Sequence, residues 1–236
     1  MRAIWKRELQ AYFYTPVGYV FMGVFLLLSS AMFYTTIMQN RSSDLPTFIG
    51  MMSYLWMLLC PVLTMRLLAE ERQKRTDQLL LTSPVSLPAV VMGKYLAAVT
   101  VMLVTVLLTG LFVLIVALYG TVYPAELLVS YLGFVLQGCA FLALDLFISG
   151  CVSSQVTAVV AAFGANFVLW MVDLLQTAIP FDWVSRVLSF FSLYARSEPF
   201  LMGQLSLASV GYDLSFAAAF LVLTIHLLDS RRYRGV

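Results

Sequence analysis

The sequence has little charge and little of the side-chain chemistry that soluble enzymes use. Only 11% of its 236 residues are charged, whereas 61% are hydrophobic. Soluble domains are about one-quarter charged, so this composition is typical of membrane proteins. Charge is absent from residues 9–40, 45–65, 95–125 and 146–172. Each of these stretches can hold the roughly 20 apolar residues with which a helix crosses a bilayer.

Patterns for catalysis and metal binding are missing as well. His226 is the only histidine, and Cys60, Cys139 and Cys151 have no CxxC spacing, so we expect packing thiols and no metal site. No nucleophile–base pair or carboxylate pair indicates a catalytic residue, and we expect no cofactor bound to this chain. A GxxxxGK[ST] phosphate loop is also absent. If ATP drives this protein, another chain must bind it.

The apolar stretches predict an all-α membrane protein with six spans, forming one domain over residues 1–236. A closed β-barrel is excluded, because barrel strands alternate apolar and polar residues whereas Val101–Ala117 is a continuous apolar run. The expected spans are Val17–Met38, Phe48–Leu68, Ala97–Leu118, Leu127–Ile148, Val156–Leu175 and Leu207–Leu228.

Basic residues indicate the orientation of these spans. With the N-terminus in the cytoplasm, the inner segments carry 11 of the 14 Lys and Arg residues, and the outer side keeps Arg41, Arg186 and Arg196. The positive-inside rule therefore predicts that both termini are cytoplasmic. The net charge of +2 marks a membrane face, and we expect no nucleic-acid partner.

Residues 1–15, which precede the first span, have the pattern of an amphipathic helix. Trp5, Leu9, Tyr12 and Phe13 fall on one arc at 100° per residue, and the polar residues fall on another. This pattern predicts an interfacial helix on the inner leaflet. A disordered basic tail is the alternative, and the phased aromatic residues disfavour it.

The outer segment 176–206 is the only long loop. Asp182 is a candidate cap for a helix in which apolar residues recur at helical spacing from Trp183 to Tyr194, with Ser192 on the polar side. No soluble insert is large enough to cover such a helix. We therefore expect a short amphipathic helix in the outer leaflet.

A charged segment, residues 69–84, separates the second and third spans. Glu70/Lys74 and Glu71/Arg75 are i,i+4 pairs with the acid first, which predicts a helix that continues to Pro84. The run 79–81 is three leucines, too apolar to remain free in water. Such a helix can dock in a groove of a soluble partner, with leucines as anchors and hydrated charges at the rim. The alternative is a solvated loop, which would need only basic residues.

Residues 71–86, ERQKRTDQLLLTSPVS, resemble the cytoplasmic signature of ABC-2-type transporter permeases. The gliding-motility-associated group of these permeases is the most similar. The six expected spans, the segment LDLFISGCVSSQ at 144–155 and the long last outer segment resemble the family as well. Two positions depart from its pattern, because Arg75 stands where glycine is usual and Gln78 stands where an acid is common.

The resemblance implies an exporter permease in the bacterial inner membrane, with ATP and Mg bound by a separate ATPase subunit. It implies a second permease copy or paralogue, and a periplasmic partner is a further candidate. The alternative is a non-transporting membrane anchor or mechanotransmitting platform for an ATPase. A proton-coupled carrier is disfavoured, since it needs no docking helix. The expected coupling residues are Glu70, Glu71, Arg72, Arg75, Thr76, Leu79, Leu80 and Pro84.

Two further sets of residues in the spans are candidates. Ala158, Ala161, Ala162 and Ala165 share one helix face, which suits either a subunit interface or packing within one chain. Intramembrane polar residues are functional candidates, so Asp145 and Asn166 are candidates for a translocation pathway. The alternatives are a hydrated or paired interfacial Asp145 and an Asn166 that bonds another helix.

Overall fold

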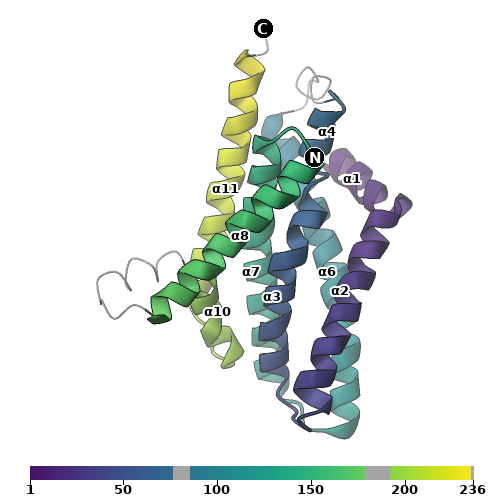
Figure 1. Cartoon of the computed structure of the whole chain (residues 1–236), viewed down its shortest axis with the longest axis vertical. Coiled ribbons are helices and arrows are strands. Elements are labelled where there is room, and N and C mark those ends of the chain that lie inside the picture. The colour runs from purple at the N-terminus through teal and green to yellow at the C-terminus, as the bar shows by residue number, and fades with distance from the viewer. Residues whose placement is uncertain (77–85, 179–191, 235–236) are drawn as a thin grey trace.

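The six apolar stretches form six long helices in the computed structural model, which describes residues 1–76, 86–178 and 192–234 (Figure 1). The predicted all-α architecture with six spans is confirmed, and the described residues contain no strand. The elements are α1 (Arg2–Tyr14), α2 (Pro16–Phe33), the π-helical turn η1 (Tyr34–Met38), α3 (Leu45–Thr64), α4 (Ala69–Gln73), α6 (Leu87–Tyr119), α7 (Pro124–Cys151), α8 (Gln155–Ala178), α10 (Leu193–Leu201) and α11 (Leu207–Arg234).

Local sequence signals explain where several spans begin. α2, α6 and α7 each have proline in the first turn. Backbone N–H groups have no helical partner there, so the missing N–H of proline costs no hydrogen bond. α3 begins after Asp44, whose carboxylate accepts a hydrogen bond from the Thr47 N–H at 3.2 Å. α6 starts at Leu87, well before the expected Ala97, and so contains Lys94.

Figure 1 shows the helices as an elongated bundle with α8 crossing it obliquely. α1, α4 and both chain termini lie at one end, which we call the basic end. The opposite end consists of the η1–α3 and α6–α7 connections. α3 is the central span, with 61% of its most apolar window buried, against 17% for α8. The exposed apolar faces of the outer helices are therefore the surfaces that suit lipid contact.

Aromatic residues pack α3 against its neighbours. The Trp56 ring meets Phe21 and Phe25 of α2 edge to face, each at 5.7 Å between centroids. Phe134 of α7 contacts the same indole at 6.1 Å. Edge-to-face pairs are a favoured geometry for aromatic rings, so this cluster fixes the relative positions of α2, α3 and α7.

α1 forms over the expected residues, and its apolar arc is covered by the bundle. The Tyr12 hydroxyl is buried and donates to the Leu63 carbonyl at 2.6 Å. Trp5 Nε1 donates to Thr100 Oγ1 of α6 at 3.1 Å. These bonds attach α1 to α3 and α6, so its aromatic residues serve internal packing in addition to any contact with lipid.

α10 differs from the outer-leaflet helix that the sequence predicts. The expected helix from Asp182 falls mainly on residues 179–191, outside the described part of the chain. The described helix starts at Leu193, and Ser192, placed on the polar face by the pattern, is instead its buried cap. The Ser192 hydroxyl accepts from the Ala195 N–H at 3.0 Å. A cap must face the first turn of its helix, which explains the difference.

Two glycines make room for α10 inside the bundle. A Cβ on Gly133 of α7 would lie 2.5 Å from the Cβ of Phe200, and one on Gly50 of α3 would lie 3.0 Å from Leu201 Cδ1. Phe200 is fully buried there, and its carbonyl accepts from Ser130 Oγ at 3.1 Å. α10 is therefore seated in the bundle wall, away from the basic end.

Candidate functional site

Four charged residues from three elements meet at the basic end. Lys94, with 1% of its side chain exposed, places Nζ 2.8 Å from Glu71 Oε1 and 3.1 Å from Glu8 Oε1. Arg7 Nη2 approaches the same two oxygens, at 3.0 Å from Glu71 and 2.8 Å from Glu8. We call Arg7, Glu8, Glu71 and Lys94 the ion-pair cluster. Its formal charges sum to zero, which is how a buried lysine is tolerated.

The surroundings keep the first-helix members of this cluster charged. Burial by itself raises the pKa of Glu8, but the charge of Lys94 and the hydrogen bonds from Arg7 and Lys94 together hold this pKa below its ordinary value. The hydrogen bond to Glu8 is the main cause that raises the pKa of Arg7. Glu8 is therefore an anion and Arg7 a cation at neutral pH.

A second group of charges surrounds Glu70. Its carboxylate binds Lys74 Nζ at 2.6 Å, the pair expected from the sequence, and also Arg66 Nε at 3.0 Å. Arg66 donates from Nη1 to Thr15 Oγ1 at 2.7 Å and lies over the Tyr12 ring. Glu71 was expected to pair with Arg75, but it turns to the ion-pair cluster instead. It is therefore not a hydrated rim charge.

α4 ends at Gln73, although the sequence predicts a helix that continues to Pro84. Arg75 has φ 55°, in the left-handed region. Its N–H donates to the Arg72 carbonyl at 3.1 Å, and the Thr76 N–H donates to the Glu71 carbonyl at 2.9 Å. These two bonds form a Schellman cap, which normally has glycine in the left-handed position. The physical reason for the short helix is this cap.

Glycine adopts this left-handed conformation without a steric cost, so the cap suits the glycine that the resemblance implies at position 75. The described part of the charged segment, residues 69–76, is therefore a short capped helix. Leu79, Leu80 and Pro84, three of the expected coupling residues, lie outside the described residues.

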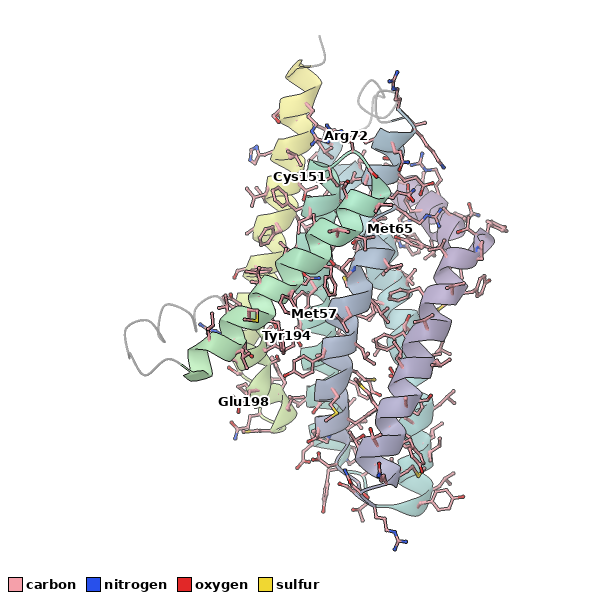
Figure 2. All side chains as sticks on the ribbon, in the orientation of Figure 1. Met57, Met65, Arg72, Cys151, Tyr194 and Glu198 are labelled. Atoms are coloured by element: carbon pink, nitrogen blue, oxygen red, sulfur yellow. The ribbon has the colours of Figure 1, made fainter. Side chains whose placement is uncertain are left out.

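α4 is also bonded to the end of α7 and the start of α8. Arg72 Nη1 donates to the Cys151 carbonyl at 3.2 Å, and the Ala69 N–H donates to Ser149 Oγ at 3.1 Å. The side-chain oxygen of Gln73 accepts from the Gln155 N–H at 3.3 Å. Figure 2 shows Arg72 and Cys151 together at the basic end. α4 is thus bonded to four other helices, α1, α6, α7 and α8, and to Arg66 in the turn that follows α3.

Sequence reasoning treated Arg7 and Lys94 as topology markers and did not identify the ion-pair cluster. A signal was present. Glu8 is the only acid among residues 1–43, and Lys94 is the only charge among residues 78–125. Isolated charges beside apolar residues need partners, and these two could have been paired with each other.

The alanine face of α8 divides between the interior and the surface. Ala158 and Ala162 are 1% and 2% exposed, and α8 contacts α3 and α7 of the same chain. For these two residues the structure gives internal packing, because small side chains let the crossing helices approach closely. Ala161 is exposed and Ala165 is half-buried. Subunit contact through them stays a prediction.

Asp145 and Asn166 lie together in the bundle, and both are fully buried. Asn166 Nδ2 donates to Asp145 Oδ2 and to the Met57 carbonyl, each at 3.3 Å. This arrangement joins α7, α8 and α3, and it differs from the hydrated interfacial position that was one expectation for Asp145. Helix bonding accounts for the contacts of Asn166, and a role of either residue in translocation stays a prediction.

Comparison with protein families shows that most of the chain, including part of the ion-pair cluster, is similar to known proteins. A family model described as ABC-2 family transporter protein matches residues 45–228, most of the chain. A comparison with curated proteins finds no significant match. The matched region contains α4, Glu71 and Lys94, whereas Arg7 and Glu8 precede it. α1 therefore adds two charges to a site whose other half lies in the family region.

Proposed function

Because the chain belongs to the ABC-2 transporter family, we propose that a separate ATPase subunit drives it by docking on α4 and the residues that follow. The family makes this multi-pass protein a membrane permease subunit of an ABC transporter. The finer proposal is an exporter of the gliding-motility-like group in the bacterial inner membrane. ATP and Mg would be bound by the partner, since this sequence has no phosphate loop.

The observation that carries the docking proposal is the bonding of α4 on two sides. Glu71 ties α4 to α1 and α6, and Arg72 ties it to the α7–α8 turn. A force applied to α4 therefore acts on most helices of the bundle through charged or hydrogen-bonded contacts. A solvated loop would need none of these bonds.

The basic end would face the cytoplasm, where ATP is available. The excess of Lys and Arg there supports this orientation. A second copy or a paralogue would complete the translocation path, and the exposed α8 face around Ala161 is one surface that suits it. A non-transporting anchor would use the same docking site, so transport has to be assayed separately from ATPase stimulation.

Co-purification tests the docking step. Tagged permease should retain an ATP-hydrolysing subunit, and the double change Leu79→Ser, Leu80→Ser should release it or abolish stimulation of its ATP turnover. The control is Lys6→Ser with Gln10→Ser, two exposed residues of α1 at the same end. If the leucine variant keeps both its partner and full stimulation while remaining folded, the docking proposal is wrong.

The orientation has its own test. A cysteine replacing Ser43, which is exposed at the opposite end, should react with a membrane-impermeant reagent in intact cells. A cysteine replacing the exposed Gln73 should react only after the membrane is opened. Labelling of the Gln73 variant from outside would place α4 out of reach of an ATPase in the cytoplasm.

A further inference from the structure

A cavity of about 340 Å³ lies between α3, α7 and α10, in the half of the bundle away from the basic end. Figure 2 shows Tyr194 and Glu198 at this level, far from Arg72 and Cys151. The cavity is separate from the ion-pair cluster and from the docking segment. The lining side chains that matter below are Ser53, Tyr54, Gln137, Asp173, Tyr194 and Glu198.

Two buried polar groups in this cavity have no hydrogen-bond partner in the part of the chain that the structure describes. Gln137 is 2% exposed, and neither atom of its side-chain amide has a hydrogen-bond partner among the described residues. The buried Tyr194 hydroxyl is likewise unpartnered within the described part of the chain. Leaving a buried donor or acceptor unpaired is costly, so groups of this kind normally bind a ligand or ordered water. The cavity therefore offers donors and an acceptor to an occupant.

The charged residues of the cavity are all acidic. Asp173 and Glu198 contribute carboxylates, and no Lys, Arg or His is among the described lining residues. Asp173 accepts a hydrogen bond from Ser192, which orients its carboxylate. The rings of Tyr54 and Tyr194 stack beside it, 4.9 Å apart and 11° from parallel. Carboxylates and aromatic faces both attract organic cations, whereas they disfavour anions.

An open groove continues from this cavity to the surface of the bundle. It has a volume of about 340 Å³, shares Tyr54 and Asp173 with the cavity, and adds Trp170 and Leu174 of α8. The groove is apolar beyond Asp173, on a helix whose outer face suits lipid contact. An occupant with a charged head and an apolar tail would match both parts.

We propose that this site binds an amphiphilic amine. Its ammonium group lies near Asp173 and Glu198 and has the Gln137 side-chain oxygen and the Tyr194 hydroxyl as further acceptors. Its apolar chain follows Tyr54, Trp170 and Leu174. A free alkylamine and an aminophospholipid share this chemistry. The proposal requires no particular mode of ATPase docking.

Dodecylamine is the probe, and dodecanol, with the same chain and no charge, is the matched ligand control. With the full chain in a neutral detergent, tryptophan fluorescence should change saturably with dodecylamine and not with dodecanol. Trp170→Phe should remove most of this signal. Asp173→Asn and Gln137→Leu should each weaken binding about ten-fold, the effect of losing one charged or buried hydrogen bond.

Glu126→Gln, an acid at the same end that lines a different hollow, should leave the affinity unchanged. Glu198→Gln, at an exposed position, tests the carboxylates without disturbing buried packing. In phosphatidylglycerol nanodiscs containing phosphatidylethanolamine, retention of that lipid by the purified wild type but not by Asp173→Asn would identify a lipid headgroup as the source. No retention together with dodecylamine binding would identify a free amine. Equal binding of amine and alcohol, no saturable binding, or full affinity in both carboxylate variants would overturn the proposal.

Discussion

The basic end and the cavity near α10 differ in whether their buried polar groups have partners among the described residues. At the basic end, Lys94 is enclosed, and its charge is matched by Glu8 and Glu71. In the cavity between α3, α7 and α10, Gln137 and Tyr194 are also buried but have no hydrogen-bond partner among the described residues. Paired charges hold elements in fixed positions, whereas unpaired groups favour an occupant. This difference is consistent with the two proposals, in which the basic end couples to an ATPase and the cavity binds an amine.

The largest effect should come from removing the central cation. Lys94→Met leaves Glu8 and Glu71 facing each other with only Arg7 between them, and we expect a loss of about 3 kcal/mol in the free energy of unfolding. Thermal unfolding in detergent measures it. Lys6→Met, an exposed cation of α1, is the control and should change little. Adding Glu8→Gln and Glu71→Gln to the methionine variant should restore stability, and failure to do so would argue against charge as the cause.

A smaller loss of stability should follow when a side chain fills the space that Gly133 leaves for α10. Gly133→Ala introduces a Cβ 2.5 Å from that of Phe200, so we expect a cost of about 1–3 kcal/mol from displaced packing. Dodecylamine binding should fall with it, because α10 carries Tyr194 and Glu198. Gly110→Ala, with open space around its Cβ, should be neutral or slightly stabilising. Wild-type stability in the Gly133 variant would show that α10 is seated loosely.

The two neighbouring acids of α4 should differ. Glu71→Gln weakens contacts to a buried lysine, and we expect a loss of about 1–3 kcal/mol. Glu70→Gln affects Arg66 and the largely exposed Lys74, so its loss should stay below about 1 kcal/mol. Parallel thermal unfolding of the two variants decides the order. Equal losses would mean that Glu71 behaves as a surface charge after all.

The smallest effect should be a gain. Arg75→Gly removes the steric cost of a left-handed residue, and we expect about 1 kcal/mol of added stability at the cap. Gln73→Gly, which places glycine at the last residue of α4 and removes the bond from the Gln155 N–H, should instead lose stability. Resistance of the 70–77 region to limited proteolysis reports both changes locally. A destabilised glycine variant would mean that the Arg75 side chain has contacts that outweigh its backbone strain.

Most of the fold could be predicted, because charge-free stretches of sufficient length have only one common solution in a bilayer. The misplaced start of α6 shows the limit of that logic. The expected span begins after Lys94, because a lone charge is unfavourable among apolar residues. In the structure, Glu8 and Glu71 neutralise this charge, so the helix can begin before it. Those partners are far away in sequence. Periodicity within one helix cannot reveal them.

The candidate site was only partly predictable for similar reasons. The charge pairing of Glu70 with Lys74 is local and was foreseen, but Glu71 has competing partners from α1 and α6. The alanine face of α8 was visible as a pattern, although the pattern does not say which side faces its own bundle. Likewise, nothing along the chain places Gln137 and Tyr194 at the same cavity. Their proximity depends on where α10 packs against α7.

The glycine seat of α10 also has a consequence for biogenesis. Gly50 and Gly133 belong to α3 and α7, so the seat exists only after these spans have inserted and come together. α10 follows both spans in the chain, so the surface that receives it can be complete before α10 itself is made. Of these three helices, α10 would be the last to pack. A variant blocked at that step should be inserted in full, yet remain open to cleavage near α10.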